Sequence, residues 1–200
     1  MAVEGSSPFR QPQESEAMVF TELPISGVYL IEVEKRGDDR GFFARTFCRR
    51  EFAERGLTPD IVQVNISMTR KRGALRGLHF QHPPHAEDKT VRCLKGRVFD
   101  VAVDLRPDSP THGRWQHAIL DGEERNMIHI PKGCAHGFQT LTEDVEMLYL
   151  HSEFYCPSAE GGLRYDSPAL GIDWPLPVCE VSNRDRSLPL FDETFEGLQP

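Results

Sequence analysis

The segment VFDVAVDL (98–105) alternates with a period of two, which is the pattern of a β-strand. Nine further segments have strand character, and turn sequences such as GDDRG, RPDSPTHG, DGEE and PKG separate them at the intervals found in sandwiches and barrels. These segments are VYLIEVEK (28–35), GFFARTF (41–47), IVQVNISMT (61–69), ALRGLHF (74–80), TVRCLKG (90–96), WQHAIL (115–120), NMIHIP (126–131), GFQTLT (137–142) and VEMLYLHS (145–152). One short helix fits REFAERGL (50–57). The pattern predicts an all-β fold, an antiparallel sandwich or jelly roll with a few short helices.

The domain organisation follows from length and local composition. The chain has 200 residues, which is enough for one well-buried domain. Residues 1–17 are rich in Ser, Gln, Glu and Pro, and we expect them to form a disordered leader. Residues 18–200 are expected to form one domain, in which the Pro- and Gly-rich segment after Tyr155 wraps the barrel as loops and short turns.

Charge and cysteine content exclude several classes of protein. The 23 basic and 31 acidic residues give a formal charge of -8, which argues against nucleic acid or an anionic membrane as the main partner. The five cysteines are odd in number and form no CxxC pair, so free thiols are expected. No secretory segment or membrane-spanning run is apparent, and we expect a cytoplasmic protein.

The segment RGLHFQHPPH (76–85) raises the question of a metal site, because it holds His79, His82 and His85. The two prolines at 83 and 84 forbid a helix, and in a strand His79 and His82 point to opposite faces. His82 and His85 are therefore expected to be exposed turn residues.

Part of the metal-binding cupin pattern is nevertheless present. PKGCAH (131–136) matches the PxGxxH core of the second cupin motif, whereas Gln81 stands where the first motif has its second His, and Glu87 is displaced. The remaining ligands, His79 and His136, are too few for a transition-metal site, so no metal is expected. Cys134, beside His136, is expected to be a small buried thiol rather than a nucleophile.

Taken together, the motifs resemble one family, the dTDP-4-dehydrorhamnose 3,5-epimerases and their 3-epimerase relatives. The resemblance covers nearly everything after the leader. It runs through GDDRGFFARTF (37–47), QVNIS (63–67), LRGLHFQ (75–81), KTVRCLKGRVFDVAVDLRPDSP (89–110), IPKGCAHGF (130–138), LYLHSEFY (148–155), GIDWP (171–175) and SNRD (182–185). It implies a cupin-type jelly roll that inverts C3, or C3 and C5, of a nucleoside-diphosphate-4-keto-6-deoxyhexose without a cofactor.

The resemblance also implies the catalytic residues. His79 is the expected base, since imidazole titrates near neutral pH. Asp185 falls on the carboxylate that fixes the tautomer of this imidazole, and Tyr149 on the donor that reprotonates the opposite face. Lys89 matches a lysine near the developing oxyanion. Asp100, on the polar face of its strand, is expected either to orient this lysine or to be solvated.

A further set of residues is implied to bind substrate. Those matching positions that hold the nucleotide, pyrophosphate or sugar are Arg40, Gln63, Asn65, Arg76, His136, Glu160 and Arg184. Tyr155 matches an aromatic that stacks on the base. Arg45 stands where the family commonly has a Glu near the base, so the sequence leaves the nucleotide open. The sequence also leaves open whether C3 alone or both C3 and C5 are inverted.

Two alternatives to this function remain at the level of sequence. One is a metal-dependent cupin oxygenase or isomerase with His79 and His136 as ligands. The other is a cupin that binds a sugar nucleotide without catalysis. By resemblance alone we also expect a homodimer, in which residues such as Arg40 reach the neighbour's site.

Overall fold

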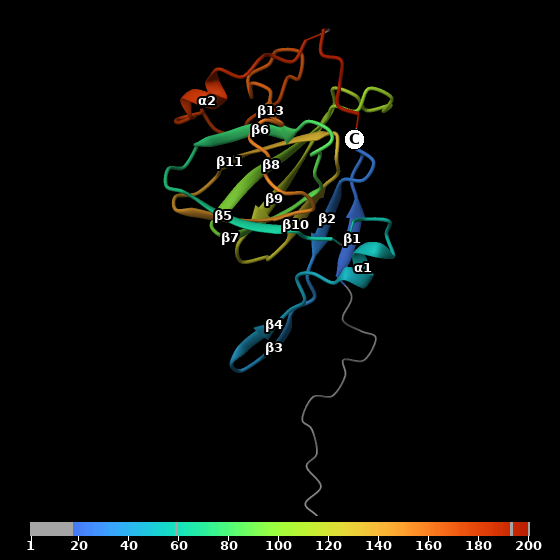
Figure 1. Cartoon of the computed structure of the whole chain (residues 1–200). Coiled ribbons are helices and arrows are strands. Elements are labelled where there is room, and N and C mark those ends of the chain that lie inside the picture. Colours follow the sequence, from blue (N-terminus) through green and yellow to red (C-terminus); the bar gives the residue numbers. More distant parts are fainter. Residues whose placement is uncertain (1–17, 59, 193, 200) are drawn as a thin grey trace, which may run out of the picture.

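The computed structural model describes residues 18–58, 60–192 and 194–199, and its strands form two antiparallel sheets that pack face to face in a cupin-like sandwich (Figure 1). The leader expected at residues 1–17 lies outside the described residues. One sheet has the strand order β1-β2-β10-β7-β12-β5 and the other β13-β6-β11-β8-β9. The bounds in the first sheet are β1 Val19–Glu22, β2 Tyr29–Glu32, β10 Met127–Ile130, β7 Lys89–Lys95, β12 Val145–His151 and β5 Gln63–Thr69. Those in the second are β13 Glu160–Gly162, β6 Leu75–Gln81, β11 Cys134–Thr140, β8 Arg97–Asp104 and β9 Trp115–Asp121.

The remaining elements are short. Strands β3 (Arg36–Asp38) and β4 (Gly41–Phe43) form a hairpin that extends away from the two sheets (Figure 1). The strand expected at 41–47 therefore ends at Phe43, because its partner β3 has only three residues. Helix α1 (Arg49–Ala53) confirms the expected helix but ends earlier. Helix α2 is Asn183–Arg186. Periodicity did not indicate β1, β3, β13 or α2, which are too short to show a period.

The main core lies between the two sheets. Residues of β7, β8, β10, β11 and β12 meet there, including Val91, Val98, Ile128, Phe138 and Met147. A second cluster packs the outer face of the five-stranded sheet against the segment after β13, and a third lies between the six-stranded sheet and α1. Strand β8 contributes to the first two clusters, so both of its faces are buried. The expectation that β8 has one solvated face is therefore wrong.

Among the described residues, neither α1 nor α2 has the length and hydrophobicity of a transmembrane helix. All five cysteines are free thiols, as the odd number and the spacing suggested.

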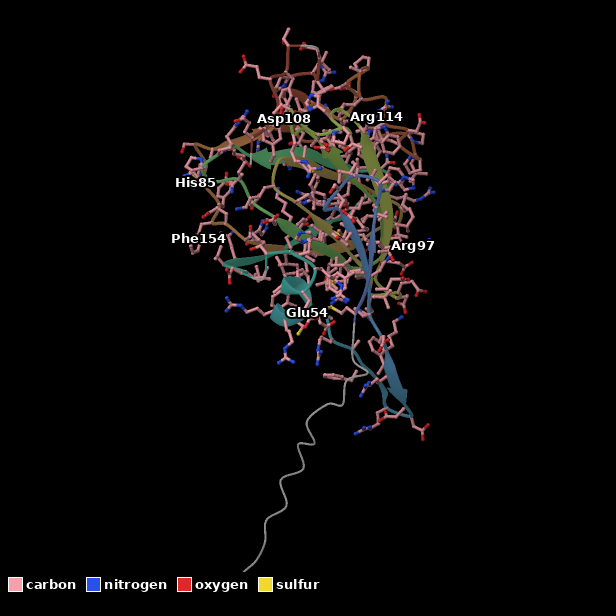
Figure 2. The ribbon with its side chains drawn as sticks, turned by 90° about the vertical axis from the view of Figure 1, so that its right-hand side faces the viewer. Glu54, His85, Arg97, Asp108, Arg114 and Phe154 are labelled. Atoms are coloured by element: carbon pink, nitrogen blue, oxygen red, sulfur yellow. The ribbon has the colours of Figure 1, made fainter. Side chains whose placement is uncertain are left out.

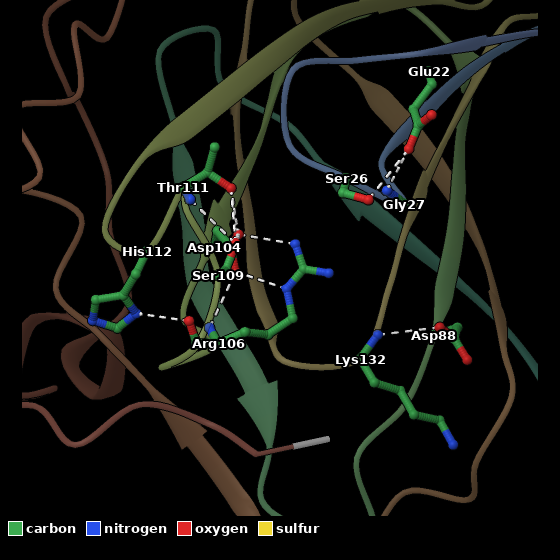
Figure 3. Close-up of polar contacts among 10 residues, drawn as sticks. All are labelled: Glu22, Ser26, Gly27, Asp88, Asp104, Arg106, Ser109, Thr111, His112 and Lys132. Carbon is green, nitrogen blue, oxygen red and sulfur yellow. Dashed lines mark hydrogen bonds and ion pairs between the residues drawn. The ribbon is translucent and has the colours of Figure 1, made fainter.

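A buried carboxylate fixes the loop that follows β8. Asp104 is fully buried, and its oxygens accept hydrogen bonds from Arg106, Ser109 and Thr111 (Figure 3). Burial alone would raise the pKa of Asp104, but these donors outweigh it and lower the pKa to about 2. The loop between β8 and β9 is thus held by an ionised carboxylate at neutral pH.

Replacing Asp104 by Asn should destabilise the fold by about 3 kcal/mol at pH 7, since it leaves the Arg106 guanidinium without its counter-ion. Because the folded pKa lies below the unfolded value, the stabilisation is complete above pH ~4 and disappears as the pH falls toward 2. Urea unfolding at pH 7 and pH 2.5 should therefore show a smaller difference between the two proteins at the lower pH. Asp108→Asn, an exposed carboxylate in the same loop, is the control. Equal differences at both pH values would contradict the assignment.

Candidate active site

A cavity of about 260 Å³ opens between the two sheets, and most of the predicted site residues line it. Both sheets contribute to its lining, β6 and β11 from one side and β5, β7 and β12 from the other. The sequence-predicted residues in the lining are Asn65, Arg76, His79, Lys89, His136, Tyr149, Tyr155 and Glu160. Segments far apart in the sequence thus meet in one place.

His79 forms the expected pair with Asp185. Its Nε2 lies 2.9 Å from Asp185 Oδ1, and the second carboxylate oxygen accepts the Gly77 N–H at 3.1 Å. Ser182 caps α2 by accepting the Asp185 N–H, which fixes the position of the aspartate. Burial would raise the pKa of Asp185, but the His79 hydrogen bond and charge and the Gly77 N–H together lower it. An ionised Asp185 makes Nε2 the protonated nitrogen and leaves Nδ1 as the basic one.

Gly77 is needed for this arrangement. Its φ of +121° lies in the region that favours glycine, and a Cβ at this position would come within 2.5 Å of Gly137 Cα on the neighbouring strand β11. The close approach of β6 to β11 therefore depends on the absence of a side chain at residue 77.

Tyr149 reaches the cavity from the opposite sheet. Its phenol oxygen lies 2.9 Å from Ser67 Oγ on the adjacent strand β5. Burial raises the pKa of Tyr149 to about 12, so the phenol carries its proton at neutral pH. His79 on β6 and Tyr149 on β12 therefore present a basic nitrogen and a protonated phenol from two walls of one cavity.

Asp100 has a different partner from the one expected. It is fully buried, and both of its oxygens lie within 3.0 Å of His136 Nε2. Burial raises the pKa of Asp100, and the His136 charge and hydrogen bond oppose that shift. The expectation that Asp100 orients Lys89 or is solvated is wrong, because its strand is buried on both faces and its side chain lies behind His136.

The partner of Lys89 is Glu87. Lys89 Nζ lies 2.9 Å from Glu87 Oε1, and the other carboxylate oxygen lies 2.7 Å from His151 Nδ1. All three side chains line the cavity. Sequence reasoning missed Glu87 and His151 as site residues, although the period of two places His151 on the same face of the strand as Tyr149.

The expected binding residues surround the same opening. Arg76 donates to Thr69 Oγ1 and to the Met68 carbonyl. Tyr155 is 52% exposed and donates its phenol hydrogen to Glu160, whose other oxygen pairs with Arg184 at 2.7 Å. The Tyr155 N–H also donates to Gln63 Oε1 at 3.2 Å, which brings Gln63 to this group.

Arg40 and Arg45 do not line the cavity. The β3–β4 hairpin projects away from the two sheets (Figure 1). Arg40 lies at its turn and pairs with Asp38. Arg45 pairs with Glu51 of α1 at 2.7 Å. Within the described chain, Arg45 is therefore bound next to α1 and not beside the site where a nucleotide base was expected.

The two histidines required by the metal alternative are each engaged with a carboxylate, His79 with Asp185 and His136 with Asp100. No group of three or more His, Cys, Asp or Glu side chains with metal-binding geometry occurs among the described residues. Gln81, in the place of a third ligand, donates to the carbonyls of His85 and Phe154 and accepts the Cys156 N–H. These contacts give Gln81 a structural role at one edge of the molecule, where Figure 2 shows His85 and Phe154.

The other residues near this motif agree with expectation in most respects. His82 is exposed, whereas His85 is partly buried. Burial raises the pKa of Cys134 to about 12, so it is a protonated buried thiol near neutral pH.

Comparison with known proteins gives a consistent result. The family model described as dTDP-4-dehydrorhamnose 3,5-epimerase matches residues 22–193. A dTDP-4-dehydrorhamnose 3,5-epimerase of Salmonella typhimurium is 42% identical over 180 residues, covering 89% of this chain and 98% of that protein.

Solved structures agree. The Bacillus anthracis dTDP-4-dehydrorhamnose 3,5-epimerase with TDP and PPi bound superimposes with a TM-score of 0.85 at 37% identity, covering 88% of this chain and all of that one. ChmJ, a 3'-monoepimerase from Streptomyces bikiniensis in complex with dTDP-quinovose, gives a TM-score of 0.78 at 34% identity and covers 84% and 85% of the two chains.

Proposed function

The chain belongs to the dTDP-4-dehydrorhamnose 3,5-epimerase family of isomerases. We propose that it inverts C3, or both C3 and C5, of a nucleoside-diphosphate-4-keto-6-deoxyhexose through His79 and Tyr149. The observation that carries this proposal is the placement of the His79–Asp185 pair and the Tyr149 phenol on two walls of one cavity. Epimerisation requires this arrangement, since a proton must leave one face of a carbon and return to the other.

The first step is removal of a proton next to the ketone. The C4 carbonyl acidifies the C–H bonds at C3 and C5, and His79 Nδ1 takes the proton. The ionised Asp185 stabilises the resulting imidazolium and holds the ring in the required tautomer. The electron pair of the broken C–H bond passes to the carbonyl oxygen and gives an enolate.

The second step returns a proton to the opposite face. Lys89 supplies a fixed positive charge for the enolate oxygen. Tyr149, which holds its proton at neutral pH, donates it to the carbon as the carbonyl re-forms. The His136–Asp100 pair lies beside Tyr149, with the His136 and Tyr149 ring centroids 6.3 Å apart, and His136 offers a polar group to the sugar in the cavity.

Binding is assigned to the group at the mouth of the cavity. Arg76, which lines the cavity, and Arg184, which pairs with the lining residue Glu160, provide guanidinium groups for the diphosphate. The exposed Tyr155 ring provides a stacking surface for the base. Asn65, Gln63 and Glu160 add hydrogen-bonding groups. Because the relatives are named for dTDP sugars, dTDP is the first nucleotide to test. Arg45 has no part in this assignment, because its guanidinium pairs with Glu51 of α1.

A homodimer is part of the proposal. Strand β5 is an edge strand whose outward row, Val64, Ile66 and Met68, is exposed, and such a row favours association. The hairpin that carries Arg40 projects beyond the sheets, from where it can reach a second copy (Figure 1). Sedimentation equilibrium should give twice the mass of one chain.

Incubation in D2O with 4-keto-6-deoxyhexoses carried on dTDP and on other nucleotides tests the function. We expect deuterium at C3, or at C3 and C5, with inversion, and the count at each centre reports whether one or two centres react. No exchange above the enzyme-free rate with any nucleotide would refute the proposal and support a binding protein. Elemental analysis showing stoichiometric transition metal, together with chelator-sensitive activity, would support the metal-dependent alternative.

A further inference from the structure

Three side chains in the cavity wall, Glu87, Lys89 and His151, form a cluster. Only Lys89 has a role in the proposed reaction. The Glu87 carboxylate accepts from Lys89 Nζ at 2.9 Å and from His151 Nδ1 at 2.7 Å. The exposed fractions of the three side chains are 8%, 11% and 14%. One carboxylate therefore joins two nitrogen groups in the wall of the cavity, largely out of solvent.

The backbone around this cluster is fixed from both sides. In the pairing of β7 with β12, Lys89 stands directly opposite His151. The residue after Glu87 is Asp88, whose N–H donates to Ser152 Oγ at 2.8 Å. Its carboxylate accepts the Lys132 N–H at 3.1 Å (Figure 3). The carboxylate is thus presented to its two partners by a segment that is itself tied down.

The cluster also shares its wall with the proposed proton donor. His151 follows Tyr149 by two residues on β12, and the two rings stack with their centroids 6.1 Å apart. Lys89 Nζ is therefore held on the Tyr149 side of the cavity, across from His79.

The charge state of Glu87 agrees with a role as an anchor. Burial would raise the pKa of Glu87, but the hydrogen bond from His151 and the charge of Lys89 outweigh it and lower the pKa. Glu87 is therefore ionised at neutral pH and accepts from both partners at once. A lysine side chain has four rotatable bonds, so such an anchor limits the positions of its ammonium group.

We propose that Glu87 is a positioning residue that holds the Lys89 ammonium where the enolate oxygen forms, and that His151 locks the Glu87 carboxylate by occupying its second oxygen. This inference rests on the proposed function, in which Lys89 stabilises the enolate. Glu87 acts through Lys89 and does not itself touch the reacting atoms. Its effect belongs to the chemical step, because a misplaced cation weakens stabilisation of the enolate more than binding of the ketone.

Glu87→Gln is the first test. The amide offers one acceptor oxygen and an NH2 group, so it can serve only one of the two donors. We expect kcat to fall about 10- to 100-fold with KM changed less than about threefold. Asp166→Asn, which makes the same carboxylate-to-amide change in the exposed pair with Arg164, should leave both constants unchanged. A wild-type kcat for Glu87→Gln would overturn the proposal.

His151 supplies a matched pair of variants. His151→Leu removes the donor to Glu87 and should lower kcat as Glu87→Gln does. His151→Gln keeps an N–H donor and should recover most of the loss. If the two variants have equal kcat values, hydrogen bonding to Glu87 is not the role of His151, and that part of the proposal fails.

A double-mutant cycle separates positioning from simple destabilisation. If Glu87 acts through Lys89, adding Glu87→Gln to Lys89→Met should produce no further loss of kcat, whereas independent effects would multiply. Multiplicative losses of kcat would overturn the proposal. A kcat that falls in step with the melting temperature across the variants would also overturn it, because the loss would then reflect destabilisation of the fold. Failure of the proposed function itself is distinguishable, since the wild-type protein would then show no deuterium exchange at all.

Discussion

His79→Asn is expected to lower turnover about 10³- to 10⁴-fold while leaving the fold intact. Asp185 keeps the hydrogen bond from the Gly77 N–H, and its own N–H still donates to Ser182 Oγ, so the α2 end keeps its position. The Asn amide cannot accept a proton from carbon near neutral pH. Deuterium exchange at C3 and C5 should therefore disappear together with inversion, because no other group is assigned to the first step.

The comparison for this variant is His82→Asn, the same change at an exposed histidine three residues further along the chain. It should retain wild-type turnover and melting temperature. Circular dichroism and thermal unfolding of both variants establish that folding is unaffected. If His79→Asn exchanges solvent deuterium into the substrate at the wild-type rate, the base is another residue and the mechanism is wrong.

Tyr149→Phe is expected to separate exchange from inversion. Phenylalanine fills the same buried space, and the variant loses only the hydroxyl and its bond to Ser67, a change of about 1 kcal/mol in stability. His79 can still remove the proton and return a deuteron to the same face. We expect inverted product to fall about 10²- to 10⁴-fold while deuterium still enters the unreacted stereoisomer.

Two measurements decide this second prediction. Nuclear magnetic resonance of the substrate pool distinguishes deuterated starting material from inverted product, and melting curves report any loss of stability. Tyr29→Phe, a tyrosine packed on the outer side of the six-stranded sheet, serves as the control and should be fully active. Undiminished inversion by Tyr149→Phe would remove Tyr149 from the reaction and assign the donor elsewhere.

Much of the sandwich was predictable from the sequence because strand periodicity is local. The strands β5 to β12 correspond to predicted segments, with ends shifted by a few residues. Within one strand the period of two also relates neighbouring side chains, as it does for Tyr149 and His151. Elements of three or four residues, such as β13 and α2, carry too little pattern to be recognised.

Strand periodicity predicted the order of most strands along the chain, and the sequence motifs identified the family and the residue types of the site. The resemblance also implied the pairing of Asp185 with His79, whereas the partners of Asp100, Lys89 and His151 became clear from the tertiary structure alone. The partners are 106 residues apart for His79 and Asp185, 64 for His151 and Glu87, and 36 for His136 and Asp100. Alternation gives the face of a residue but not the strand or loop packed against it, and for this reason Asp100 was assigned to Lys89 and the role of Glu87 was missed. The carboxylate that pairs with a given lysine or histidine depends on how the strands and the two sheets pack, which the local sequence pattern does not specify.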